Sequence, residues 1–170
     1  MQGDLALRER ISEKLQLLYG KTYDVGSEIT VTAGATQAIF TAIAATIHAG
    51  DEVIVFAPSY DCYEPAVALF GGVTKPIQLR PPSYRPDWEE VAHTITPKTK
   101  LIIINSPHNP SGMLFSEEDM LILQNLAEKH DLMLISDEVY EHIIFDGEMH
   151  QSAARFEALA QRTFITASFG

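Results

Sequence analysis

The chain has 170 residues, enough for one domain with a hydrophobic core, and its formal net charge of -11 argues against a nucleic-acid partner, which would need clustered Lys and Arg. Its longest apolar stretch, residues 38–47, is about half as long as a membrane span, which needs roughly 20 residues. One cysteine, Cys62, and no visible signal peptide predict a cytoplasmic chain without an internal disulfide.

Apolar residues recur at helical spacing from Leu5 to Leu18, which predicts an amphipathic helix that ends near Gly20. After it, short apolar runs alternate with helical patterns. We expect strands at residues 29–32, 52–56, 74–78, 101–104, 132–135 and 164–167. Helices are expected at residues 36–48 and 60–70, and two more are opened by Asp87 and Ser116. This alternation predicts an α/β fold with a mostly parallel sheet.

Polar residues follow two of the expected strands. Residues 105–112 read NSPHNPSG and come after one strand, while residues 136–140 read SDEVY and come after the next. Open α/β sheets bind ligands at the carboxyl ends of such strands. An Asn-rich turn and an Asp-to-Tyr pair at one edge of the sheet could hold a heteroaromatic ring with one basic nitrogen and one phenolic oxygen. Pyridoxal phosphate has such a ring.

Asp137 has two interpretations. It could cap the next helix, which is a common role of Asp, or it could face the ring nitrogen of the cofactor. A buried carboxylate in that place would keep the nitrogen protonated and make the ring an electron sink for a carbanion at the substrate α-carbon. Tyr140 lies three residues on and can reach the same side, which favours the cofactor interpretation.

The turn Gly34-Ala35-Thr36 lies between an expected strand and an expected helix. Its amides and the Thr hydroxyl could bind a phosphate at the positive end of that helix, although many strand-to-helix turns look alike. Tyr60 could lie flat on the pyridine face, with a stacking energy of about 1 kcal/mol, or it could belong to the core. Tyr63 makes the core interpretation credible for one of these two tyrosines.

Longer segments resemble a known family. Residues 30–39 (TVTAGATQAI) are similar to the phosphate loop, and residues 58–65 (PSYDCYEP) to the ring-stacking segment, of class I and II aminotransferases. These are the aspartate-aminotransferase-like enzymes, which bind pyridoxal phosphate and have fold type I. The resemblance covers the whole chain. Within the family, the segments are most similar in style to those of the methionine and kynurenine aminotransferases.

The resemblance implies a role for each candidate residue. Asp137 matches the partner of the pyridinium nitrogen, and Tyr140 and Asn109 match the residues that bind the phenolic oxygen. Tyr60 matches the stacking residue and Ser168 the second phosphate contact. The implied cofactor-binding set is Gly34, Ala35, Thr36, Tyr60, Asn109, Asp137, Tyr140 and Ser168. Asn105 is interpreted as a residue that shapes the turn.

The resemblance also implies how the protein is organised. Residues 1–170 would be part of a three-layer αβα large domain that binds pyridoxal phosphate, truncated at both ends and without the small C-terminal domain. In the family, the stretch like residues 166–170 is followed at once by the lysine that forms the Schiff base. We therefore expect no catalytic residue in the chain itself, and we expect the parent protein to be a cytoplasmic homodimer.

The implied activity of the parent protein is transamination between an amino acid, of methionine, glutamine or aromatic type, and a 2-oxo acid. Two alternatives stay open. One is a carbon-sulfur lyase, which uses the same cofactor cradle for elimination, and the other is a noncatalytic remnant or split subunit. We expect no metal site, because the histidines lack the paired spacing of a metal-binding helix. Cys62 is expected to be a packed residue, since the sequence places no activating base for it.

Overall fold

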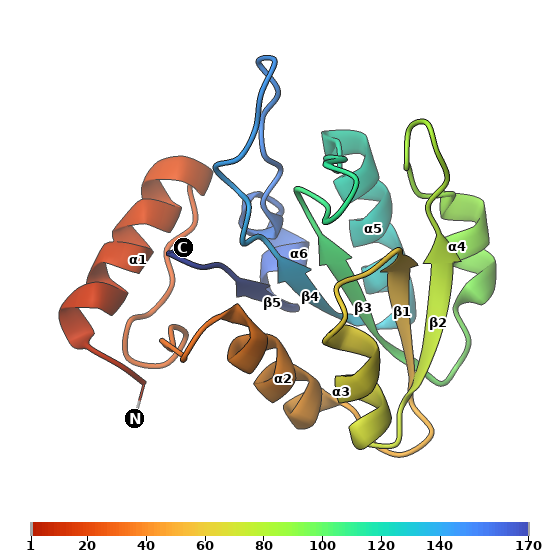
Figure 1. Cartoon of the computed structure of the whole chain (residues 1–170). Coiled ribbons are helices and arrows are strands. Elements are labelled where there is room, and N and C mark those ends of the chain that lie inside the picture. Colours follow the sequence, from red (N-terminus) through yellow and green to blue (C-terminus); the bar gives the residue numbers. More distant parts are fainter. Residues whose placement is uncertain (1, 170) are drawn as a thin grey trace.

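The computed structural model describes residues 2–169 and contains a five-stranded sheet in the order β2-β1-β3-β4-β5. The strands are β1 (Glu52–Ala57), β2 (Val73–Gln78), β3 (Thr99–Asn105), β4 (Met133–Asp137) and β5 (Thr163–Thr166). Every neighbouring pair in this sheet is parallel. Because of this, all five strands end at the same edge, and the loops that follow them meet there (Figure 1).

Helices cover both faces of the sheet, as the sequence predicted (Figure 1). They are α1 (Leu5–Tyr19), α2 (Ala35–Thr46), α3 (Tyr63–Leu69), α4 (Trp88–Thr94), α5 (Glu117–His130) and α6 (Glu157–Ala160), with a 3-10 turn η1 (Ala153–Arg155). One face packs on α2 and α3, and the other on α4, α5 and α6. The predicted three-layer αβα architecture is therefore confirmed. No helix among residues 2–169 is both long and apolar enough to cross a membrane.

The central strand β3 shows why its sequence is an unbroken apolar run. Ile102 and Ile104 point into one core cluster, while Leu101 and Ile103 point into the other. A strand that is buried on both faces needs apolar residues at every position. All four side chains are at most 1 % exposed, and each such burial contributes about 1.5–3 kcal/mol.

Capping residues fix where most of the longer helices begin. The side chain of Asp4 accepts a hydrogen bond from Leu7 at the start of α1, and Asp87 caps α4. Ser116 and Asp119 form a reciprocal capping box at the start of α5. The first turn of α2 is different, because it follows Gly34 and has no side-chain cap. Its free amides are available to a ligand.

Two expected elements differ from the structure. Residues 29–32 are not a strand: Val31 N donates to Gln2 O at 2.9 Å, and no partner strand lies beside them among residues 2–169. A β-strand needs a neighbour to satisfy its amides and carbonyls, which the apolar pattern alone does not supply. The helix expected at residues 60–70 begins at Tyr63, so Tyr60 lies in the preceding loop.

Candidate cofactor site

A pocket of about 340 Å³ lies between the first turn of α2 and the carboxyl ends of β3 and β4. It is lined by Ala35, Thr36, Ile39, Tyr60, Asn105, Asn109, Asp137, Val139, Tyr140 and Ser168. Gly34 comes directly before this set, with φ at 111°, and an added Cβ would meet no atom within 4 Å. The structure thus gathers the residues that the sequence proposed from five separate segments.

Asp137 is the last residue of β4 and is only 3 % exposed. Burial raises the pKa of its carboxyl group above the usual range, although a hydrogen bond from Tyr63 acts in the opposite direction. The other oxygen, Oδ1, has only a long contact of 3.4 Å with Val139 N. No cationic side chain among residues 2–169 pairs with this buried carboxylate, and a positively charged ligand in the pocket would compensate its charge.

Tyr63, in the first turn of α3, donates its hydroxyl hydrogen bond to Asp137 Oδ2. Burial and the nearby Asp137 raise the pKa of Tyr63, so its hydroxyl stays protonated and remains a donor. Its ring also meets Tyr60 edge to face, with 5.9 Å between ring centroids and 77° between the planes. Tyr63 is therefore the buried member of the pair, and Tyr60, 38 % exposed, is the one that lines the pocket.

Asn105 ends β3 and shapes the turn, as the sequence predicted. Its Nδ2 donates to Asp137 O at 2.9 Å, and its Oδ1 accepts from Asn109 N at 2.7 Å. The side-chain amide of Asn105 thus links the main chain of Asp137 to the main chain of Asn109. The side chain of Asn109 thereby reaches the pocket wall.

His108 joins the two loops that flank the pocket. Its Nε2 donates to Pro58 O at 2.9 Å and its Nδ1 accepts from Ser111 Oγ at 2.7 Å. Burial lowers the pKa of His108, which favours the neutral ring that this arrangement of one donor and one acceptor requires. The loop that carries Tyr60 is thus tied to the loop that carries Asn109.

The other end of the pocket has groups that favour an anion. The uncapped first turn of α2 points its amides there, beside the Thr36 side chain. Backbone amides and the positive end of a helix favour anions. Ser168, in the loop after β5, lines the same pocket and is exposed. One pocket thus offers a carboxylate at one end and free amides at the other.

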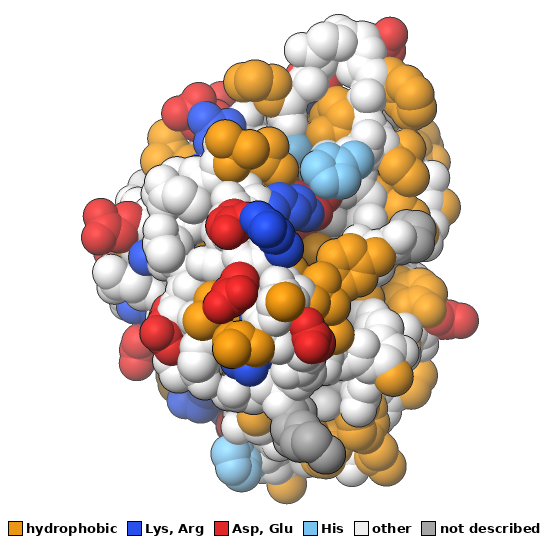
Figure 2. Space-filling model, turned by 90° about the vertical axis from the view of Figure 1, so that its left-hand side faces the viewer, with side chains coloured by type: hydrophobic (Ala, Val, Ile, Leu, Met, Phe, Trp, Pro, Cys, Tyr) orange, Lys and Arg blue, Asp and Glu red, His pale blue; other side chains and the backbone are white. Residues whose placement is uncertain are grey.

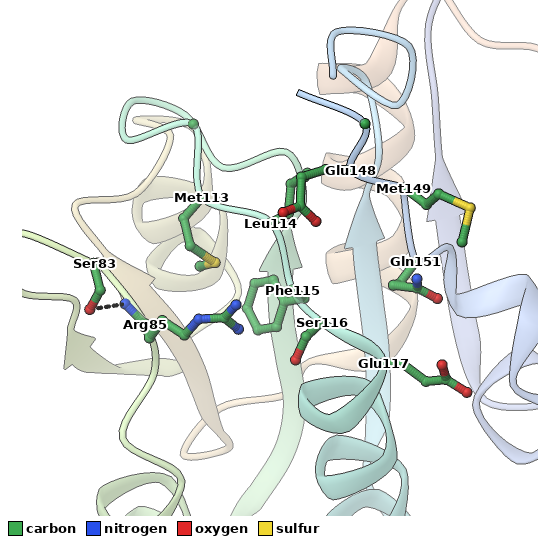
Figure 3. Close-up of a pocket in the computed structure, with 12 residues that line it drawn as sticks. Ser83, Arg85, Met113, Leu114, Phe115, Ser116, Glu117, Glu148, Met149 and Gln151 are labelled. Carbon is green, nitrogen blue, oxygen red and sulfur yellow. Dashed lines mark hydrogen bonds between the residues drawn. The ribbon is translucent and has the colours of Figure 1, made fainter. Parts of the chain in front are cut away.

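A larger hollow of about 550 Å³ lies elsewhere, among the loops before α4, before α5 and after β4 (Figure 3). Arg85 is its cationic group, and its Nη1 already pairs with Asp119 Oδ2 at 2.5 Å. Trp88 Nε1 donates to the other oxygen of Asp119 at 2.8 Å. Because the one cationic side chain in its lining already pairs with Asp119, this hollow is a weaker candidate for chemistry than the smaller pocket.

Sequence reasoning missed three contributors to the site. Ile39 and Val139 line the pocket with apolar surface, and nothing in their residue type distinguishes them from core residues. Tyr63 acts on Asp137 from 74 positions away, and only the fold shows that contact.

Cys62 is half-buried, and burial raises its pKa to about 11, so its thiol stays protonated. No group of three metal-binding side chains occurs within residues 2–169.

Comparisons with known proteins agree with this geometry. The family model "Aminotransferase class I and II" matches residues 1–170. Among curated proteins, the methionine aminotransferase of Escherichia coli is 47% identical over 170 residues, which are 100% of this chain and 44% of that protein. The human kynurenine–oxoglutarate transaminase 3 is 39% identical over 178 residues, covering 99% of this chain and 39% of that protein.

Solved structures have the same fold. An Escherichia coli methionine aminotransferase superposes with a TM-score of 0.97 and 47% identity, over 99% of this chain and 45% of that one. The aromatic aminotransferase of Pyrococcus horikoshii gives a TM-score of 0.95 and 37% identity, over 99% and 45%. The chain thus spans less than half the length of these relatives. It belongs to the class I and II aminotransferases, a family of enzymes that use pyridoxal phosphate.

Proposed function

We propose that the pocket holds pyridoxal phosphate. Asp137 would face the ring nitrogen, and Tyr140 and Asn109 would face the phenolic oxygen, while Tyr60 would lie against the ring. The phosphate would bind the amides of Gly34, Ala35 and Thr36 and the hydroxyl of Ser168. Bound pyridoxal phosphate is an electron sink that stabilises negative charge at the α-carbon of an amino acid.

The observation that carries this proposal is the environment of Asp137. Its carboxylate is buried, its pKa is raised by that burial, and its neighbours supply one hydroxyl donor. A pyridinium N–H at Oδ1 would provide both the missing hydrogen bond and the compensating charge. Asp137 in turn would keep the ring nitrogen protonated.

We further propose that the complete protein, meaning this chain together with the rest of the length that its relatives have, is a cytoplasmic homodimer that catalyses transamination. Its substrates would be an amino acid of methionine, glutamine or aromatic type and a 2-oxo acid. Relatives named for methionine and for kynurenine and oxoglutarate support this substrate class. The lysine that the family carries after the stretch like residues 166–170 would form the Schiff base.

The proposal is tested by Asp137→Ala in the complete protein. The substitution should lower kcat/KM for transamination by at least about a hundredfold, as expected for the loss of a charged group at the reacting centre. It should also weaken equilibrium binding of pyridoxal phosphate, measured by dialysis. The control is Glu9→Ala, which removes an exposed carboxylate on α1. Near-normal turnover of Asp137→Ala would refute the assignment.

A further inference from the structure

Tyr140 lies in a turn whose main chain is held from both sides. Glu141 N donates to Glu138 O at 3.0 Å, and Ile143 N donates to Tyr140 O at 2.7 Å. The side chain of Tyr140 lines the cofactor pocket but has no hydrogen-bond partner of its own among residues 2–169. Its position therefore depends on the residues that anchor the turn.

Glu138 is the first anchor. Its carboxylate is 1 % exposed and receives three hydrogen bonds: from Ser136 Oγ at 2.7 Å, from Ala153 N at 3.0 Å and from His150 Nε2 at 2.9 Å. The imidazole of His150 is also buried and packs edge-on against the ring of Tyr19 in α1, with centroids 6.0 Å apart. A buried carboxylate with three donors is fixed in place.

Glu141 is the second anchor, on the far side of Tyr140. Its carboxylate is 7 % exposed and accepts hydrogen bonds from Lys14 Nζ and, at 2.5 Å, from Tyr19 Oη. Burial alone would raise the pKa of Glu141, but the bonds from Lys14 and Tyr19 outweigh it and lower the pKa. His142 also lies near this carboxylate, with its Nε2 at 3.9 Å from Oε1.

Tyr19 connects the two anchors, because its hydroxyl bonds Glu141 and its ring packs on the His150 that holds Glu138. Both Tyr19 and Lys14 belong to α1, which lies beside the open side of β5 (Figure 1). The outer face of the molecule on this side carries basic groups beside acidic ones, with hydrophobic side chains spread between them (Figure 2).

We propose that Tyr19 and Lys14 of α1, acting through Glu141, are positioning residues that hold Tyr140 in the geometry it needs to bind the cofactor. They do not touch the cofactor themselves. This inference rests on the proposed function, in which Tyr140 binds the phenolic oxygen of pyridoxal phosphate. It adds a function for the N-terminal helix, which lines no part of the pocket.

The test is a double-mutant cycle on the affinity of the complete protein for pyridoxal phosphate, with Tyr19→Phe and Tyr140→Phe. Tyr19→Phe keeps the ring and removes only the bond to Glu141, so the protein should still fold. Alone it should weaken cofactor binding about threefold to tenfold, the effect of about one hydrogen bond. In the Tyr140→Phe background it should have almost no effect, because the group that it positions is gone.

Tyr84→Phe is the matched control, since Tyr84 is half-buried and its hydroxyl has no hydrogen-bond partner among the described residues. It should leave the affinity unchanged in both backgrounds. If Tyr19→Phe weakens binding equally with and without Tyr140→Phe, its effect does not pass through Tyr140 and the inference is wrong. If Tyr140→Phe itself leaves the affinity unchanged, the proposed contact of Tyr140 with the cofactor fails, and the inference falls with it.

Discussion

The two sides of the carboxyl end of β4 hold adjacent carboxylates with opposite environments. Asp137 faces the pocket, where it has one hydroxyl donor and a raised pKa. Glu138, the next residue, faces the layer of η1, where three donors surround it. Both are at most 3 % exposed, so burial does not distinguish them. The number of hydrogen-bond donors distinguishes them. A carboxylate whose hydrogen bonds are satisfied within the protein stabilises the fold, and one that lacks donors is available to a ligand.

The geometry of a strand explains this division. Successive side chains point to opposite faces, so two neighbouring acids at a strand end must enter different surroundings. The main chain between them is fixed, because Ser106 N donates to Asp137 O at 3.1 Å and Glu138 N donates to Thr166 O at 2.8 Å. These two main-chain bonds therefore hold in place the peptide that carries Asp137 into the pocket.

Because of this difference, the same truncation to Ala should have a large effect on stability at Glu138 and a small one at Asp137. Glu138→Ala should lower the free energy of unfolding of the cofactor-free protein by about 3 kcal/mol, because His150, Ser136 and Ala153 N would lose a buried acceptor. Asp137→Ala should change it by less than about 1 kcal/mol, since only Tyr63 loses a strong partner. Urea unfolding of both variants measures the difference. Equal losses for the two would show that donor number does not separate them.

A second prediction concerns pH. The pKa of Asp137 is raised in the folded protein, so its protonated form contributes stability that is present at low pH and lost as pH rises through the folded pKa. At neutral pH the ionised group therefore costs stability, and Asp137→Asn should remove that cost. The variant should melt about 2 °C or more above the cofactor-free parent at pH 7.

The gain in melting temperature should shrink as the pH falls and should vanish below about pH 3.9, the ordinary pKa of Asp, where the parent carboxyl is neutral too. Thermal unfolding from pH 3 to pH 8 gives this curve. A gain that persisted unchanged at low pH would mean that packing, and not charge, causes it. The same variant should bind pyridoxal phosphate poorly, so stability and function would move in opposite directions.

These residues also show how far the sequence could go. The strand-to-turn pattern located Asp137, Tyr140 and Asn109 at one sheet edge, because parallel strands always end together. It could not show that Glu138 turns away from them or that Tyr63 reaches Asp137, since both depend on contacts between distant segments. The same limit explains residues 29–32, whose apolar pattern predicts a strand but cannot supply a neighbour to pair with.

The smallest expected effect comes from the removal of one oxygen atom beside Asp137. Tyr63→Phe keeps the ring that packs on Tyr60 and removes the hydroxyl that donates to Asp137 Oδ2. That hydrogen bond lowers the pKa of Asp137, so its loss should raise this pKa further, with a cost in stability of about 1 kcal/mol. Titration of the Asp137 carboxyl carbon by NMR would follow the change.

Ser136→Ala is the matched substitution on the other side, where it removes one hydroxyl donor from Glu138 and leaves two donors in place. It should leave the Asp137 titration where it is, because Ser136 does not touch that carboxylate. If Tyr63→Phe left the Asp137 titration equally unmoved, the hydroxyl would not control this group. The raised pKa of Asp137 would then have to come from its burial at the pocket wall alone, and the number of donors would not explain how it differs from Glu138.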